Sequence, residues 1–354
     1  MWENLVGRHI RRCNRNLFFV NAVILVALLV WGYSSKCYLY NCFKGPFPTT
    51  HDALVKIADA SVLQRYFVSV NHLEPLETGL QYVETTKDKY TQEVKSQKIT
   101  ATYFAASLGE DRFLIIKSPA SKPASRYDGS LTVVPGDVRA YFQKELLDSK
   151  ERKFEEVFVP YLLDAETFRS QAYWGFLFAV PLGALAAFNI YKAINRFSNI
   201  EVSPIFTSLK RFNQPPAITA DMIQQEVNTS GDLSPVRSVC VTSSWFLRKS
   251  LFGLAVLHWT EIVWIYQKVT SHYYQCVPTG KTYALIVGDV YGRRIEVEVG
   301  RWKAKDATTR LLSLLASNLP WVVAGYTEDL KTEYEKNRAG FIAAVQERQK
   351  QYSR

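Results

Sequence analysis

Two long runs of uncharged, largely apolar residues constrain this chain more than any other feature. The first has 20 residues without a charge, 16–35, and the second has 22, 170–191. A helix that rises about 1.5 Å per residue needs roughly 20 apolar residues to cross a hydrocarbon core of about 30 Å. Both runs therefore predict transmembrane helices, which we place at residues 17–35 and 171–191.

Two alternatives to transmembrane helices have to be considered. A buried helix of a soluble protein is one, but apolar runs of such helices are usually shorter. For the first run, a cleavable signal peptide is another, and it needs small residues just after the apolar stretch. Here bulky Tyr33 precedes Ser35, and Lys36 stands directly before Cys37, where a lipoprotein signal needs a small residue. We therefore expect an anchor that is retained.

Charge is distributed unevenly over the three parts that two spans create. Of the net charge of +10, the head, residues 1–16, carries +3. Residues 34–171 hold 18 basic and 18 acidic side chains, and residues 192–354 carry +7. Lys and Arg near the ends of spans favour the cytoplasmic side. We therefore expect a two-pass protein of the cell membrane, with both termini cytoplasmic and residues 36–170 outside.

The cysteines fit this topology. Cys37 and Cys42 fall on the outer side, where a disulfide persists, and Cys13, Cys240 and Cys276 fall inside, where thiols stay reduced. We interpret the C-x4-C pair as a small structural disulfide loop. A metal or redox centre is the alternative, but a lone C-x4-C without a second Cys/His pair makes a poor zinc site. We predict no metal and no cofactor.

Residues 36–170 combine strand-like runs with two helical segments. The runs are RYFVSV, LQYVET, KITATYFAAS, RFLIIKS and SLTVV. Turn and capping residues predict helices over 52–62 and 137–147. This order predicts a compact extracytoplasmic α+β domain with a mostly antiparallel sheet. It contains no G-x-S-x-G, H-E-x-x-H or P-loop motif.

The tail begins with a linker and a short helix over residues 192–235. Residues 236–320 then read as a series of short strands: VRSVCVT, SWFLRKS, GLAVLHW, EIVWIYQKV, KTYALIVGD and RRIEVEVG. The last two predict a hairpin, and an apolar face predicts a closing helix over 305–319. Residues 321–354 predict a charged amphipathic helix with a thin apolar stripe, able to dock on the strands or on a partner.

The stretch SWFLRKSLFGLAVLHWTEIVWIYQKV resembles bacterial pleckstrin-homology-like (PH-like) domains. The chain is also similar to uncharacterised two-span membrane proteins with a W-x-Y, a P-T-G-K-x-Y turn and a late P-W…G-Y. These correspond here to Trp264–Tyr266, Pro278–Tyr283, Pro320-Trp321 and Gly325-Tyr326. The resemblance covers residues 236–326 and implies a β-rich split barrel closed by a C-terminal helix. The basic run that phosphoinositide-binding PH domains place in their first strand–loop–strand unit is reduced here to Arg248 and Lys249.

Basic residues of the tail form three clusters that could face an anionic leaflet or a partner. They are Lys210, Arg211, Arg248, Lys249, Arg293, Arg294, Arg301, Lys303 and Lys305. Each cation close to such a surface contributes about 1 kcal/mol. The alternative for each cluster is a solvated basic face. We expect no nucleic-acid partner, because the sequence shows no nucleic-acid-binding motif.

Three functional hypotheses follow from these patterns. The first is a non-enzymatic scaffold or sensor whose inner domain binds a protein or anionic lipid. The second is a membrane-anchored enzyme with an outer site built from acids such as Asp128 and Asp137. The third is an accessory subunit of a transport or secretion complex, suggested by Asn21, Pro181 and Asn189 within the spans. Such a subunit would associate through its spans or its C-terminal helix.

Overall fold

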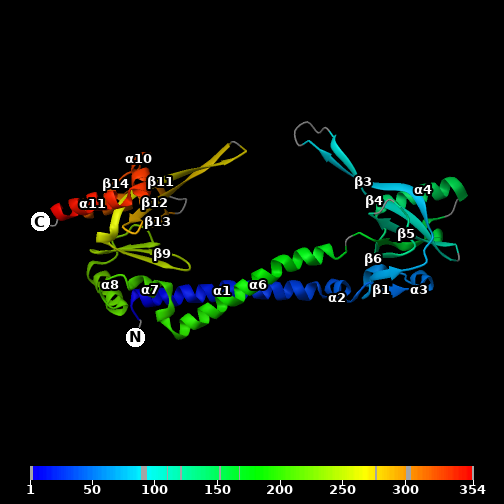
Figure 1. Cartoon of the computed structure of the whole chain (residues 1–354), viewed down its shortest axis with the longest axis horizontal. Helices are drawn as coiled ribbons and strands as arrows, with labels where there is room; N and C mark the ends of the chain where they lie inside the picture. The colour runs from blue at the N-terminus through cyan, green and yellow to red at the C-terminus, as the bar shows by residue number, and fades with distance from the viewer. Residues whose placement is uncertain are drawn as a thin grey trace. The chain divides into compact units, whose positions relative to one another are not determined.

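The computed structural model of the chain describes residues 3–88, 94–109, 111–119, 122–150, 153–166, 168–275, 277–299 and 304–352. The chain divides into two compact units (Figure 1). One unit comprises Met1–Val23 and Ala186–Arg354, and the other comprises Ile24–Leu185; they are named the inner and the outer unit after the expected topology.

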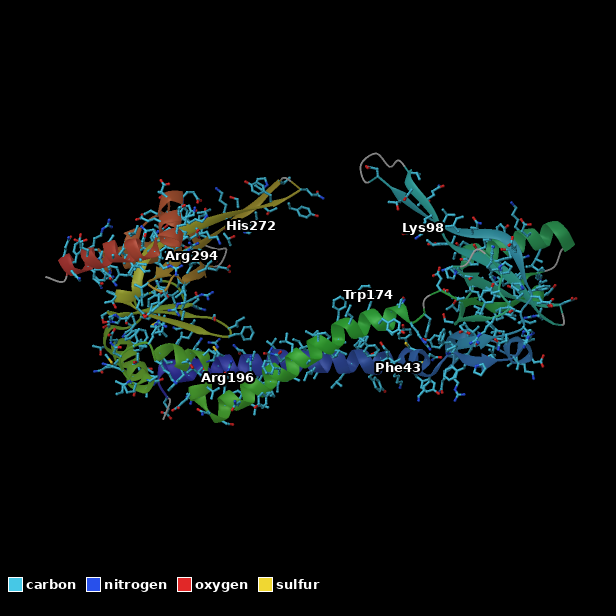
Figure 2. The ribbon with its side chains drawn as sticks, in the orientation of Figure 1. Phe43, Lys98, Trp174, Arg196, His272 and Arg294 are labelled. Atoms are coloured by element: carbon cyan, nitrogen blue, oxygen red, sulfur yellow. The ribbon has the colours of Figure 1, made fainter. Side chains whose placement is uncertain are left out.

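Two helices are long and apolar enough to cross a membrane. They are α1 (Leu5–Ser34) and α6 (Ser170–Ser198). Only 6% of the apolar window of α1 and 11% of that of α6 are buried inside the structure, so neither is the core helix of a soluble domain. In α6, Trp174 lies near the start and Arg196 near the end (Figure 2). The prediction of two candidate spans is confirmed.

The two helices contact each other through small and polar residues. Asn189 Nδ2 donates a hydrogen bond to Asn21 Oδ1 at 3.2 Å. The ring of Trp31 packs against Gly175, where an added Cβ would lie 3.0 Å from it. Close contact at small residues and hydrogen bonds between side chains are the usual means of helix association in lipid. The polar Asn21 and Asn189 are thereby satisfied within the pair.

The outer unit is built on a seven-stranded sheet of order β1-β2-β6-β7-β5-β4-β3. Its strands are β1 (Phe47–Thr49), β2 (Phe67–Val70), β3 (Pro75–Lys87), β4 (Val94–Gly109), β5 (Arg112–Ser118), β6 (Tyr127–Val133) and β7 (Phe158–Asp164). The pairs β1–β2 and β5–β7 are parallel, and the other four are antiparallel. This confirms an α+β unit with a mostly antiparallel sheet.

Helices and apolar side chains cover both faces of this sheet. The helices are α2 (Lys36–Lys44), α3 (His51–Val55), η1 (Ala60–Val62), α4 (Gly136–Lys150) and α5 (Phe154–Val157). Ile115 and Ile116 are fully buried in two different clusters, because successive strand residues point to opposite faces. The single helix expected over 52–62 is divided into α3 and η1, and Asp59 caps the second of these.

The strands of the inner unit form two open sheets. One has the order β10-β9-β8, with β8 (Val239–Val241), β9 (Trp245–Lys249) and β10 (Leu254–His258). The other has the order β13-β12-β11-β14, with β11 (Ile262–Tyr274), β12 (Val277–Asp289), β13 (Arg294–Val299) and β14 (Val323–Ala324). The antiparallel β12–β13 hairpin is as expected.

The split barrel that the resemblance implied is not closed. Within the described ranges, no strand pairing joins the two sheets. The short helix η3 (Trp259–Glu261) separates β10 from β11, so that β11 starts a new sheet. The sheets instead share one apolar core, to which α9 (Ala304–Asn318) contributes Leu311 and Leu315.

The remaining helices lie on the outsides of these sheets. They are η2 (Ile200–Val202), α7 (Pro204–Leu209), α8 (Pro216–Ser230), α10 (Glu328–Lys336) and α11 (Arg338–Tyr352). The single C-terminal helix expected within residues 321–354 is thus two helices that meet at Asn337. Their apolar stripe, including Tyr334, Phe341 and Val345, packs around Trp264 in β11. The stripe therefore docks on the chain's own strands.

Candidate anion-binding pocket

The structure assigns the predicted cations to different roles. Arg301 and Lys303 lie outside the described residues. Lys210 and Lys305 are exposed. The other five have defined surroundings, and only Arg248 and Lys249 among them line a cavity without forming an ion pair within the described ranges.

Arg211 is a structural residue. Its Nε lies 2.7 Å from Glu261 Oε1 and its Nη2 lies 3.0 Å from Oε2, so the two side chains form a bidentate ion pair. Nη2 also donates to the carbonyl of Val256. The side chains are 17% and 9% exposed. Arg211 therefore joins the segment after α7 to β10 and η3, and is unsuited to contact a membrane surface.

Arg293 and Arg294 are also engaged inside the unit. Arg293 Nε lies 2.7 Å from Oδ2 of the fully buried Asp289, which holds the β12–β13 turn together. Arg294 Nη2 lies 2.6 Å from Glu335 Oε1, and its guanidinium lies 5.6 Å from the centre of the Trp264 ring. The ion pair between Arg294 and Glu335 joins α10 to β13. The adjacency of Arg293 and Arg294 in the sequence did not indicate that each forms an ion pair with a different carboxylate.

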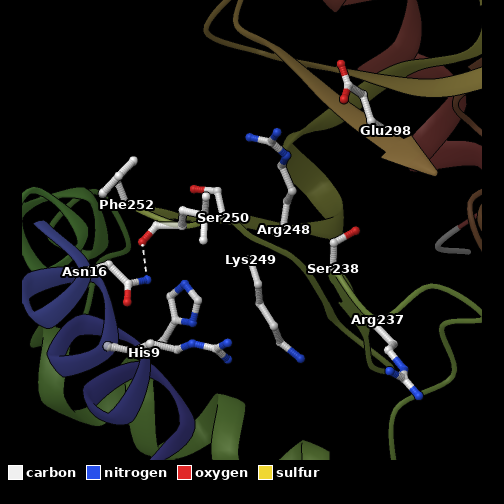
Figure 3. A pocket seen from close by; sticks show the side chains of 11 residues that line it. His9, Asn16, Arg237, Ser238, Arg248, Lys249, Ser250, Phe252 and Glu298 are labelled. Carbon is white, nitrogen blue, oxygen red and sulfur yellow. Dashed lines mark hydrogen bonds between the residues drawn. The ribbon is translucent and has the colours of Figure 1, made fainter. Parts of the chain in front are cut away.

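Arg248 and Lys249 instead line a cavity of about 740 Å³, together with residues from two distant parts of the chain (Figure 3). Arg237 comes from the segment before β8, and His9 and Arg12 come from α1. His9, Arg12 and Asn16 follow one another at spacings of three and four residues, which places them on one face of the helix. In the sequence, Arg12 indicates topology but gives no sign of a place in this cavity.

The start of α1 is part of the inner unit's own core. Val6, Ile10 and Cys13 are buried in a cluster with Leu247 of β9 and Val256 of β10. The amide of Leu5 also donates to Gln224 Oε1 of α8 at 2.7 Å. The basic head is therefore packed against the strands, and Arg12 is held at the cavity by this packing.

Side chains of α1 also fix the β9–β10 turn that forms one wall of the cavity. His9 Nε2 lies 3.1 Å from the carbonyl of Gly253, and Asn16 Nδ2 donates to the carbonyl of Leu251 at 2.9 Å. The thiol of Cys13 lies 3.8 Å from the carbonyl of Ser250. The turn and the helix thus hold the lining cations in fixed relative positions.

The cavity is suited to an anion. Arg12, Arg237, Arg248 and Lys249 form no ion pair in the part of the chain that the structure describes, and Glu298 is the carboxylate in the lining. Three guanidinium groups and one ammonium group line this cavity, with Arg248 and Lys249 extending to opposite sides of β9 (Figure 3), and arginine can bind phosphate oxygens with two donors at once. The arrangement favours binding of a phosphate-bearing molecule.

Asp128 and Asp137, the acids considered for an outer active site, lie on different elements, β6 and α4. Asp128 is exposed and pairs with Arg126, whose Nε lies 3.2 Å from Asp128 Oδ1. Asp137 is exposed in the first turn of α4. Across the described ranges, no group of three or more His, Cys, Asp or Glu side chains is arranged to hold a metal ion.

The expected disulfide between Cys37 and Cys42 is not formed in the structure. Both are free thiols on α2, Cys37 exposed and Cys42 buried. Residues five apart on a helix are separated by about 7.5 Å along its axis and point in different directions. A disulfide needs its Cα atoms within about 7 Å, so this bond requires α2 to unwind locally.

A family model described as a domain of unknown function (DUF6709) matches residues 209–334. Arg237, Arg248 and Lys249 lie within the matched residues, and His9 and Arg12 lie outside them. No curated protein and no solved structure matches the chain.

Proposed function

We propose that this chain is a two-pass protein of the cell membrane whose inner unit binds the phosphate-bearing headgroup of an anionic lipid, as a scaffold or sensor. In this topology both termini are cytoplasmic and residues 36–170 are outside. The charge distribution supports it, because the head carries +3 and the tail +7 while the middle is neutral.

One observation carries the proposal. Part of the cationic pocket is built by α1 itself, immediately before its uncharged run begins at Asn16. If α1 crosses a bilayer, Arg12 lies at the level of the headgroups, and an anion held in this pocket is at the membrane surface. A lipid headgroup is therefore a closer match than a nucleic acid or a dissolved phosphate compound.

The resemblance to PH-like domains also supports a binding role for the inner unit. Two largely antiparallel sheets that share a core with a following helix are consistent with it, although the sheets are open. The proposal is non-enzymatic: Asp128 is paired with Arg126, and Asp137 is exposed in the first turn of α4.

The test measures binding of short-chain phosphatidic acid and phosphatidylserine to the purified full chain in detergent micelles by isothermal titration calorimetry. Each cation near an anionic surface contributes about 1 kcal/mol, and about 1.4 kcal/mol is a tenfold change in affinity. We therefore expect the double variant Arg248→Glu/Lys249→Glu to bind at least tenfold more weakly.

Lys210→Glu is the matched control, because Lys210 is an exposed cation that does not line the pocket. It should bind like the unmodified chain, and short-chain phosphatidylcholine should not bind. Competition by inorganic phosphate at similar concentration would identify a dissolved phosphate ligand instead of a lipid. Unchanged affinity of the double variant would overturn the proposal.

A further inference from the structure

The β9–β10 turn presents two apolar side chains to solvent at the edge of the cationic pocket. Leu251 is 67% exposed and Phe252 is 52% exposed. Both line the pocket, next to Arg248 and Lys249. Two neighbouring large apolar residues at the tip of a turn, with cations beside them, form a pattern that suits the boundary between lipid headgroups and acyl chains.

The turn is tight and its shape is fixed. Lys249 and Leu254 are the last paired residues of the two strands, so Ser250 to Gly253 form the turn. The amide of Ser250 donates to the carbonyl of Gly253 at 2.9 Å, and Ser250 Oγ donates to the same oxygen at 2.8 Å. These bonds close the base of the turn, while its two central side chains extend outward.

The part of α1 that contacts the turn indicates which environment surrounds Leu251 and Phe252. Asn16, which donates to the carbonyl of Leu251, is the first residue of the uncharged run, and Leu17 follows it. Cys13 and His9 contact the same turn about one and two helical turns earlier. The tip is therefore bound to α1 where its apolar, lipid-facing part begins.

We infer that the β9–β10 turn inserts Leu251 and Phe252 into the leaflet that α1 enters, directly beside the headgroup site. This inference rests on the proposed function in one respect, that α1 crosses the bilayer. The insertion orients the inner unit so that the pocket opens onto the membrane surface. The headgroup then has a cationic wall from β9 and α1, and its acyl chains lie beside the apolar tip.

A fluorescent label at the tip tests the insertion. Phe252→Cys is made in a chain that also carries Cys37→Ser and Cys276→Ser, since Cys37 is an exposed thiol and Cys276 lies outside the described residues. Cys13, Cys42 and Cys240 are buried and stay. The full chain is labelled with an environment-sensitive nitrobenzoxadiazole group and reconstituted into nanodiscs that contain doxyl-labelled lipid.

The matched control carries the label at Tyr273→Cys, a position in the β11–β12 hairpin that is also exposed (67%, against 52% for Phe252) and does not line the pocket. We expect the emission of the label at 252 to shift to the blue and to be quenched several-fold more strongly than that at 273. Equal exposure of both labels to water would overturn the inference. So would protection that appears only at high protein density, because a second copy of the chain then covers the tip.

The lipid composition separates this inference from the proposed function. Insertion depends on attachment to α1 and should occur in phosphatidylcholine nanodiscs as well as in those containing phosphatidylserine. Headgroup binding depends on Arg248 and Lys249 and needs the anionic lipid. A label at 252 that stays in water while anionic lipid still binds refutes the insertion alone. A buried label in a chain without affinity for anionic lipid refutes the headgroup site alone.

Discussion

At the scale of single residues, burial and ion pairing distinguish the structural cation Arg211 from Arg248 and Lys249, for which we propose a binding role. Arg211 and Glu261 are both largely enclosed and satisfy each other with two hydrogen bonds. Arg248 and Lys249 are only half-buried and have no carboxylate partner among the described residues. Mutations of the two kinds of cation should therefore affect different properties, stability in the first case and ligand affinity in the second.

Removing one partner of the enclosed pair should destabilise the inner unit. In Arg211→Met, Glu261 keeps a buried charge without its counterion, and such losses cost about 3–5 kcal/mol. The free energy of unfolding, measured by chemical denaturation with tryptophan fluorescence in micelles, should fall by that order. The double variant Arg211→Met/Glu261→Gln should recover part of it. A loss no larger than that of the exposed control Lys210→Met would contradict this role.

Glu226 should make stability depend on pH in the acid range. Burial tends to raise its pKa, but hydrogen bonds from Thr242, Ser244 and Ser243 outweigh this and hold the pKa below 4.5. A carboxyl with a lowered folded-state pKa stabilises the fold above its unfolded-state value. This stabilisation is lost as the pH falls from about 4.5 through the lower folded-state pKa.

The variant Glu226→Gln removes the titrating group while keeping its shape. We expect its unfolding free energy, followed from neutral to acid pH, to decline less steeply below pH 4.5 than that of the unmodified chain. At neutral pH the variant should be the less stable of the two. Parallel curves throughout the acid range would exclude Glu226 as a contributor.

At the scale of elements, local sequence patterns predicted where strands lie, but they did not predict strand ends that depend on pairing with a distant strand. The strand over 112–118 appeared where its apolar run predicted it, and the run over 281–289 lies within β12, which begins earlier, at Val277. The run expected over 261–269 continues to Tyr274, because its polar end is paired with β12 in a long hairpin (Figure 1). The sequence pattern of the exposed end resembles a loop, and only the partner strand makes it a strand.

The contact between α1 and α6 makes a prediction about glycine. A Cβ on Gly175 would lie 3.0 Å and 3.2 Å from atoms of the Trp31 ring, whereas one on Gly32 meets nothing within 4 Å. Gly175→Val should therefore separate the helices and lower stability by about 1–3 kcal/mol, as overpacking does. Thermal unfolding in micelles, followed by circular dichroism, should show a lower midpoint for Gly175→Val than for Gly32→Val. Equal midpoints would mean that this contact is dispensable.

At the scale of the whole molecule, the proposed topology predicts which thiols react in intact cells. Cys37 is exposed and should react with a membrane-impermeant maleimide from outside, while the buried Cys42 and Cys240 should not. In a Cys37→Ser/Cys276→Ser chain, a thiol at Tyr273→Cys should react only after the cells are permeabilised. Labelling at position 273 from outside in intact cells would reverse the topology and remove the lipid proposal with it.

The sequence by itself determined the two candidate spans, the charge asymmetry between the three parts and most individual elements. These are local properties, set by the residues within one helix or strand and by their spacing. Only the tertiary structure decided that the barrel is open and that Arg211, Arg293 and Arg294 are engaged in ion pairs. It also brought Arg12 to the same cavity as Arg248, more than two hundred positions away. The physical reason is that the free energy of a charged side chain depends on the counterions and solvent around it, and folding selects these from distant parts of the chain.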